Sequence, residues 1–203
     1  MNTVRVLLAD DQRLFREAVR SLLRLQPGIE VVAEAATGRQ ALDQISAHDP
    51  DLAVLDIEMP DGDGLHTART LQEHGARCKV LIVTTFGRAG YLQRAIDSGV
   101  VGFILKDASA DALAHAIRRC AEGHKIIDPG LAAAARRTGP SPLTPREREV
   151  LRATAGGATV PEIAALLHLS QGTVRNKISS AIAKLSARNR TDALRIATRN
   201  GWL

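Results

Sequence analysis

Five side chains capable of phosphate chemistry stand at the ends of short apolar runs of the chain. They are the carboxylates of Asp10, Asp11 and Asp56, the hydroxyl of Thr84 and the ammonium group of Lys106. In an open parallel sheet, ligands bind beyond the carboxyl ends of the strands, because loops and helix N-termini converge there. We therefore expect these five groups to meet at one edge of such a sheet.

Three carboxylates that lie close together are expected to bind a cation. Two carboxylates 4 Å apart repel each other by about 4 kcal/mol at an effective dielectric constant of ~20, which opposes full ionisation. A divalent metal offsets this repulsion, and oxygen ligands with room for water favour Mg²⁺. A carboxylate can attack phosphorus while a metal and a lysine stabilise the transferred group. Asp56 is the best candidate nucleophile, because the turn after it, residues 58–64, leaves it open to a partner.

The apolar runs that must position these groups are rich in β-branched residues and nearly continuous in hydrophobicity. They cover residues 4–9, 30–35, 52–56, 79–85 and 102–106. Such runs are typical of strands buried on both faces of a parallel sheet. In the segments between them, apolar residues recur with the period of a helix, and each predicted helix has one apolar stripe that we expect to face the core. The four stripes are Leu14, Ala18, Leu22 and Leu25; Ala41, Leu42 and Ile45; Leu92, Ala95 and Ile96; and Leu113, Ala116 and Ile117. Five strands alternating with five helices predict a doubly wound, flavodoxin-like α/β domain.

The alternation stops after residue 125. Residues 126–142 combine an alanine run with Pro and Gly turn formers, and we expect a linker there. Beyond it, helix starts are marked by capping boxes at Thr144 with Glu147 and at Thr159 with Glu162, and by N-caps at Ser170 and Thr191. These signals predict a small domain of four helices, in which the short gap between the second and third suits a helix-turn-helix.

The third of these helices is predicted to contact DNA. Its apolar stripe is formed by Val174, Ile178, Ala181, Ile182 and Leu185, which turns Arg175, Asn176, Lys177, Ser179 and Ser180 outward. Arg can contact guanine and Asn adenine, while Lys, Ser and Thr hold phosphates. The predicted DNA contacts are Thr173, Arg175, Asn176, Lys177 and Ser180. A solvated charged face is the alternative for such a run taken by itself.

Charge separates the two halves of the 203 residues, although the net charge of the whole is only +5. Residues 1–128 hold 15 Lys+Arg and 18 Asp+Glu, a net charge of −3, whereas residues 129–203 hold 12 and 4, a net charge of +8. This division is typical of a control domain joined to a nucleic-acid-binding domain. No apolar run is long enough for membrane insertion, and Cys78 and Cys120 have no CxxC spacing, so we expect a cytoplasmic protein without disulfides.

The first 125 residues resemble the receiver domain of two-component response regulators. The matching motifs are ADD at residues 9–11, LDIEMPDGDG at 55–64, VTT at 83–85 and FILK at 103–106. The resemblance implies that a sensor histidine kinase phosphorylates Asp56. It further implies that Mg²⁺ is held by Asp10, Asp11, Asp56 and the backbone carbonyl of Glu58.

The same resemblance assigns roles to three more residues. Lys106 would pair with the phosphate, Thr84 would hydrogen-bond it on activation, and Phe103 would turn inward behind Thr84. The family often has Tyr at the position of Phe103, so this chain lacks that hydroxyl. We expect the phosphate to shift an existing two-state equilibrium of the fourth loop and helix.

Residues 143–203 resemble the LuxR-type DNA-binding domain, through LTPREREVL at 143–151 and PEIAALLHLSQGTVRNKIS at 161–179. Together the two resemblances identify the NarL/FixJ class of response regulators, and residues 83–107 look closer to its desaturase-regulating, DesR-like group. They imply double-stranded promoter DNA as a partner. Because one recognition helix covers only a half-site, phosphorylation is expected to promote a homodimer.

The alternative function is that of a metal-dependent aspartyl-phosphate phosphatase. It would use Asp56 in the same way, with Glu58 as the general acid. The Met59-Pro60 turn directs the chain away, and a phosphatase would leave the basic half without a purpose, so we expect a regulator and not an enzyme. Flavin binding is disfavoured because the first loop carries Asp10 and Asp11 in place of a Ser/Thr/Gly phosphate cradle.

Overall fold

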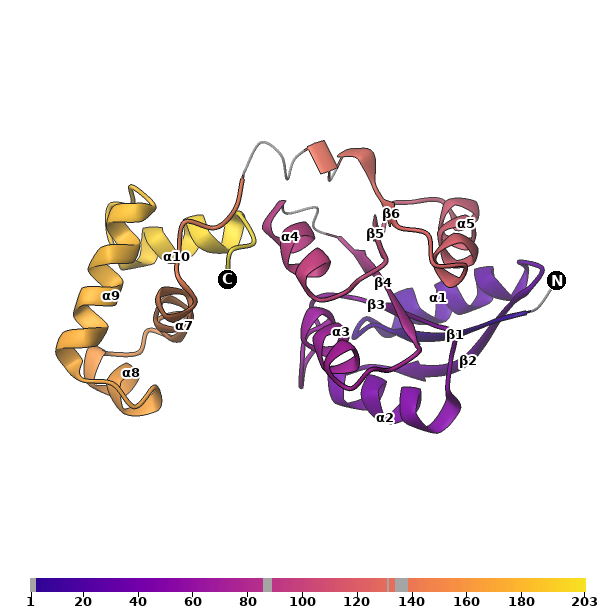
Figure 1. The fold of residues 1–203 in the computed structure, drawn as a ribbon, viewed down its shortest axis with the longest axis horizontal. Coiled ribbons are helices and arrows are strands. Elements are labelled where there is room, and N and C mark those ends of the chain that lie inside the picture. The colour runs from indigo at the N-terminus through magenta and orange to yellow at the C-terminus, as the bar shows by residue number, and fades with distance from the viewer. Residues whose placement is uncertain (1–2, 86–88, 131, 134–138) are drawn as a thin grey trace. The chain divides into compact units, whose positions relative to one another are not determined.

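A computed structural model describes residues 3–85, 89–130, 132–133 and 139–203 (Figure 1). The chain forms two compact units that divide near residue 133. Part of the alanine run of the predicted linker lies outside the described residues. Among the described residues, no helix is long and apolar enough to cross a membrane.

The first unit is built on a parallel sheet with the strand order β2-β1-β3-β4-β5-β6. Its strands are β1 (Val4–Ala9), β2 (Ile29–Ala35), β3 (Leu52–Leu55), β4 (Lys79–Thr84), β5 (Gly102–Leu105) and β6 (Ile126–Ile127). The five predicted strands are confirmed. The sixth, which pairs with β5, was missed because two residues are too short to show a period, and it lies within the range expected to be linker. The chain order reverses at β1 and β3, the position where such sheets bind ligands.

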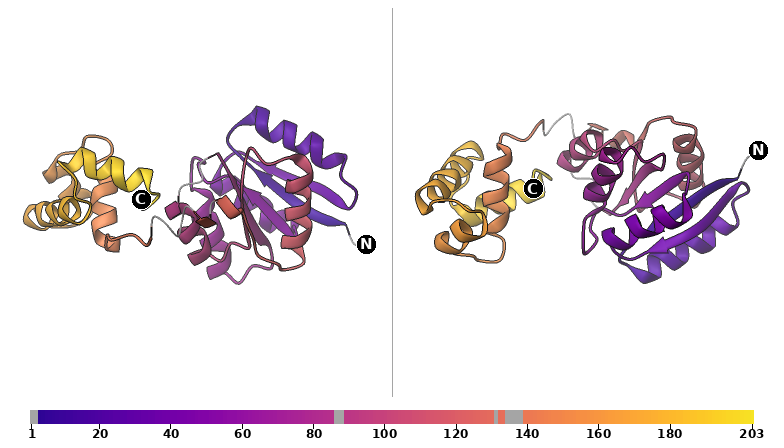
Figure 2. Two further views of the ribbon diagram at one scale, coloured as in Figure 1. Left: turned by 90° about the horizontal axis from the view of Figure 1, so that it is seen from above. Right: turned by 60° about the horizontal axis from the view of Figure 1, so that its bottom comes forward.

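Helices cover both faces of this sheet (Figures 1 and 2). They are α1 (Arg13–Arg24), α2 (Gly38–His48), α3 (Gly64–Glu73), α4 (Ala89–Asp97) and α5 (Ala110–Ala121). Helices α1 and α5 pack against each other, as do α2 and α3. Alternate strand residues such as Val6, Val54 and Leu81 form one core with α1 and α5, which buries this face of the sheet.

The predicted core stripe of α1 is wrong. Leu14 and Leu25 are 81% and 79% exposed, whereas Val19 and Leu23 are buried. The helix carries two rows of apolar residues at helical spacing, and the row that includes Phe15, Val19 and Leu23 is the one that packs on the sheet. On α4, Ile96 is 45% exposed, while its predicted neighbours on the stripe, Leu92 and Ala95, are buried.

The second unit contains the four predicted helices, α7 (Pro145–Ala153), α8 (Val160–Leu166), α9 (Gln171–Lys184) and α10 (Arg190–Arg199). Thr144 and Glu147 form the expected capping box, and Ser170 caps α9 as predicted. The cap of α10 is Asn189 and not Thr191, because the Asn189 side chain accepts a hydrogen bond from the Asp192 amide at 2.9 Å. The chain between α8 and α9 spans only residues 167–170, as in a helix-turn-helix.

Candidate functional site

Asp56 is the first residue after β3 and lies at the carboxyl edge of the sheet. Its backbone amide donates to the carbonyl of Ala9 at 2.9 Å, which ties it to the neighbouring strand. Only 4% of the residue is exposed. One carboxylate oxygen accepts from the amide of Ile57 at 2.7 Å and the other from Lys106 Nζ at 2.8 Å. The side chain is therefore held in one orientation.

Lys106 follows β5 directly and reaches back across the edge of the sheet. Its amide donates to the carbonyl of Thr84, the last residue of β4, at 2.8 Å. Its ammonium group lies 2.7 Å from an oxygen of Asp10 and 2.8 Å from one of Asp56, and 4.5 Å from the centre of the Phe15 ring. One buried cation thus serves two buried carboxylates.

The expected acidic cluster is present. Ligand oxygens of Asp10, Asp11 and Asp56 all lie within 4.8 Å of one another; the first and last of these residues are buried and Asp11 is exposed. Such an oxygen set suits Mg²⁺, which needs few protein carboxylates and keeps several waters. The side chain of Glu58 is exposed and is not part of this cluster.

The electrostatics of the cluster favour an added cation. Burial raises the pKa of Asp56, and although Lys106 opposes this, the nearby charge of Asp10 adds to it. Burial by itself would lower the pKa of Lys106, but hydrogen bonds and charge attraction to Asp10 and Asp56 outweigh it and leave the pKa raised. The lysine therefore stays charged without fully compensating the carboxylates.

The loop after Asp56 depends on two glycines that sequence reasoning did not single out. A Cβ on Gly64 would lie 2.1 Å from the backbone oxygen of Asp56, and one on Gly38 would lie 1.9 Å from the oxygen of Gly62. The Gly64 amide also donates to the carbonyl of Ile57 at 3.0 Å. The GDG pattern at residues 62–64 was visible in the sequence, but the close backbone approach was not.

Helix α9 presents a polar face beside its buried stripe. Val174, Ile178 and Ala181 are buried, while Arg175 and Asn176 are exposed. Three of the predicted DNA contacts are less open: Thr173, Lys177 and Ser180 are partly buried. The prediction that Ser180 points outward needs correction, because its hydroxyl donates to the buried carboxylate of Glu147 at 2.7 Å. Ser180 sits at the border between the two faces, where spacing does not decide the direction.

Comparisons with known families match both units. Residues 6–118 match the response regulator receiver domain, and residues 141–197 match the bacterial regulatory proteins of the luxR family. The chain is a response regulator. Its receiver is joined to a LuxR-type DNA-binding domain, the arrangement of the NarL/FixJ class.

Relatives of this response regulator align over nearly its whole length. The uncharacterized transcriptional regulatory protein YvfU of Bacillus subtilis (strain 168) is 45% identical, over 98% of this chain and 100% of that protein. The transcriptional regulatory protein DesR of the same strain is 42% identical, over 98% of both chains. The structure of RcsB in complex with DNA is 25% identical with a TM-score of 0.66, covering 98% of this chain and 99% of that one. The family is one of DNA-binding transcriptional regulators and not of enzymes, so the phosphatase alternative is set aside.

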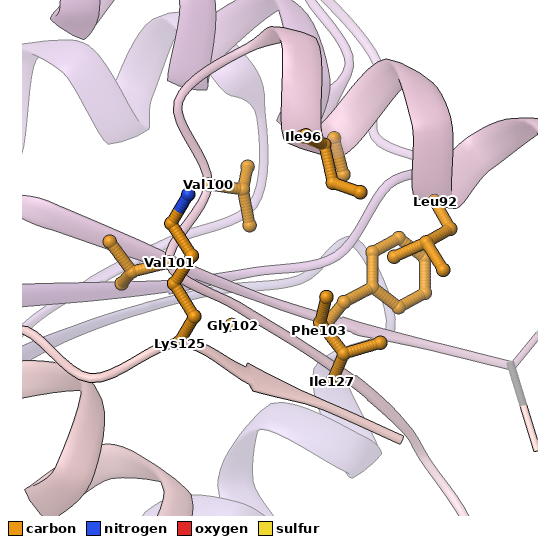
Figure 3. A pocket seen from close by; sticks show the side chains of 9 residues that line it. Leu92, Ile96, Val100, Val101, Gly102, Phe103, Lys125 and Ile127 are labelled. Atoms are coloured by element: carbon orange, nitrogen blue, oxygen red, sulfur yellow. The ribbon is translucent and has the colours of Figure 1, made fainter. Parts of the chain in front are cut away.

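Phe103 of this response regulator already lies inside the receiver. The residue is 1% exposed, and its ring lies between Leu92 of α4 and Ile127 of β6 (Figure 3). It borders an apolar cavity of about 20 Å³, which has room for about one water molecule. The short sixth strand is thus part of the wall around this aromatic ring.

Proposed function

We propose that this response regulator is switched by phosphorylation of Asp56 by a sensor histidine kinase. The observation that carries the proposal is a buried Asp56 carboxylate held by Lys106 next to Asp10 and Asp11. A free oxygen lone pair of Asp56 would attack phosphorus as the bond to the kinase histidine breaks and its electron pair returns to the imidazole. When bound, Mg²⁺ would offset charge on the phosphoryl oxygens.

The chain's own residues would then read the phosphate. We propose that Lys106, which pairs with Asp56, also pairs with a phosphoryl oxygen, and that the buried Thr84 at the end of β4 donates to another, with Phe103 behind it. Each charge-assisted hydrogen bond is worth about 1.5–3 kcal/mol. Moving a two-state equilibrium from 1:99 to 99:1 needs about 5.5 kcal/mol, so a few such bonds suffice.

Asp56→Asn is expected to abolish phosphoryl incorporation, because the amide cannot act as the nucleophile. The purified full chain is incubated with acetyl phosphate and Mg²⁺, and its intact mass is measured. Asp61→Asn is the matched control: Asp61 is an exposed acid of the same loop with φ of 51°, a conformation that Asn tolerates. Full incorporation by Asp56→Asn, or equal loss in both variants, would contradict the assignment.

We propose that phosphorylation promotes a homodimer of this response regulator, and that the homodimer binds promoter DNA in the cytoplasm and controls transcription. The proposed division is a receiver at residues 1–125, a linker at 126–142 and a DNA-binding domain at 143–203. The first two residues of the linker range form β6, which pairs with β5 and so extends the receiver sheet. Support comes from the +8 charge of residues 129–203 and from the likeness to RcsB in complex with DNA. Thr173, Arg175, Asn176 and Lys177 are the proposed DNA contacts, and Ser180 is left out of the set because its hydroxyl bonds to Glu147.

Arg175→Ala is expected to weaken DNA binding by about 1–3 kcal/mol, because an exposed arginine near the start of α9 can pair with a guanine edge. Fluorescence anisotropy measures the affinity for a duplex selected by the wild-type protein from a random-sequence library. Arg152→Ala removes the same charge from an exposed site on α7 and serves as the control. Equal affinities of the two variants would remove Arg175 from the base-reading set.

A further inference from the structure

A network of two arginines and a glutamate lies beside the acidic cluster. Arg16, in the first turns of α1, donates from Nη1 to the backbone carbonyl of Asp10. Its Nε lies 3.3 Å from Oε2 of Glu34 on β2, and Arg20 Nη1 lies 2.6 Å from the other oxygen of that carboxylate. The Arg16 side chain is only 16% exposed. Glu34 therefore orients the guanidinium group of Arg16, which donates a hydrogen bond to the Asp10 carbonyl.

This hydrogen bond matters because the Asp10 carboxylate is held separately, by Lys106 Nζ at 2.7 Å, whereas the Asp10 carbonyl depends on Arg16. Helix α1 begins after Gln12, whose side chain makes no capping hydrogen bond. The Asp10 amide donates to the carbonyl of Ala35 at 3.1 Å, and Asp10 Oδ1 accepts from the Gln12 amide at 2.9 Å. The carbonyl of Asp10 is held by Arg16 alone among the hydrogen bonds of the described residues. Losing that bond would free the peptide that follows Asp10 and carries Asp11.

We propose that Arg16, oriented by Glu34 and Arg20, is a positioning residue for the divalent cation at Asp10, Asp11 and Asp56. This inference rests on the proposed Mg²⁺ site. Mg²⁺ demands near-octahedral geometry with oxygens at about 2.0–2.1 Å, so small movements of the ligands reduce its affinity. Groups that orient metal ligands without touching the metal commonly change affinity by about 10–100-fold.

The sign of the effect separates positioning from simple electrostatics. Arg16 is a positive charge close to a cation site, and by charge alone its removal should tighten Mg²⁺ binding. By positioning, its removal should loosen binding, because the Asp10 carbonyl loses its donor. A neutral variant of nearly equal length, Arg16→Met, therefore gives opposite results under the two explanations.

Isothermal titration of the full chain with Mg²⁺ measures the effect, supported by Mn²⁺ binding followed by electron paramagnetic resonance. Arg16→Met is expected to bind Mg²⁺ about tenfold more weakly than wild type. Arg13→Met is the matched control, because Arg13 carries the same charge at the start of the same helix, its side chain is 83% exposed, and its ion pair in the described part of the chain is with Glu17. Equal or tighter binding by Arg16→Met would overturn the proposal.

Further variants keep the outcome interpretable. Arg16→Lys keeps a charged donor but lacks the planar guanidinium group that contacts Asp10 and Glu34 together. We expect its affinity for Mg²⁺ to lie between those of wild type and Arg16→Met, so this variant tests the proposal even if Arg16→Met folds poorly. Glu34→Gln should weaken binding in the wild-type background and have no further effect in Arg16→Met, because Glu34 acts through Arg16. Additive effects would overturn that order. If wild type binds Mg²⁺ no better than Asp11→Asn, the proposed metal site itself fails, which is distinct from failure of Arg16 to position it.

Discussion

Gly64→Ala is expected to destabilise the receiver by roughly 3 kcal/mol and to suppress phosphorylation of Asp56. The new Cβ would lie 2.1 Å from the backbone oxygen of Asp56 and 3.0 Å from its carbonyl carbon. Since both atoms belong to the backbone, relief requires the β3–α3 loop to move, and overpacking of this kind costs about 1–3 kcal/mol or more. The same movement displaces the nucleophile from Lys106. Hydrogen exchange of β3 amides measures the stability, and incorporation from acetyl phosphate measures the chemistry.

The control for this substitution is Gly156→Ala. A Cβ at Gly156 would meet nothing within 4 Å, and its φ is not positive. This variant should phosphorylate normally, with stability within about 0.5 kcal/mol of wild type. Normal exchange and full phosphorylation of Gly64→Ala would show that the loop can shift freely, and that the close approach does not position Asp56.

Residues at strand ends were the most predictable part of the site. Buried parallel strands give continuous apolar runs, so the point where each run ends is readable, and parallel topology then brings the ends together. Asp10, Asp56 and Lys106 meet for this reason. Arg16 and Glu34 were not predicted, because their contact depends on how α1 leans on β2 and leaves no spacing signal.

The face of α1 could not be chosen from periodicity. Two rows of apolar residues run along this helix, and Leu14 and Leu25 belong to the one that faces outward. The buried row includes Phe15, whose ring packs on the core and lies beside Lys106. Packing against α5 and the sheet decides which row is buried, and a single helix does not contain that information.

The prediction that Ser180 faces outward was wrong because helix packing, and not residue spacing, decides its direction. Its partner, Glu147, lies at the polar centre of the DNA-binding domain. Glu147 is 3% exposed and accepts hydrogen bonds from the Thr144 amide, the Ser180 hydroxyl and Lys184 Nζ. The capping box predicted only the first of these bonds. The other two tie α7 to α9, so the carboxylate links the start of one helix to the helix proposed to read DNA.

Glu147→Gln is expected to destabilise this domain by about 2–3 kcal/mol at neutral pH. Burial would raise the pKa of Glu147, but hydrogen bonds from Lys184, Thr144 and Ser180 outweigh it and lower the pKa to about 2. A shift from the ordinary value of about 4.5 corresponds to roughly 3 kcal/mol of stability. Urea unfolding followed by fluorescence of Trp202, the single tryptophan of the chain, reports this domain.

The pH dependence of the Glu147 effect follows from the direction of that shift. A carboxyl group whose folded pKa is depressed contributes stability above its unfolded pKa and loses it as pH falls toward the folded value. The difference between wild type and Glu147→Gln should therefore be full above about pH 5 and shrink as pH falls from about 4.5 toward 2. Glu149→Gln on the same helix is the control: Glu149 is exposed in its pair with Arg146, so its loss should cost less than about 1 kcal/mol. A Glu147→Gln deficit of the same size at pH 7 and pH 3 would mean that packing, and not the buried charge, holds α7 to α9.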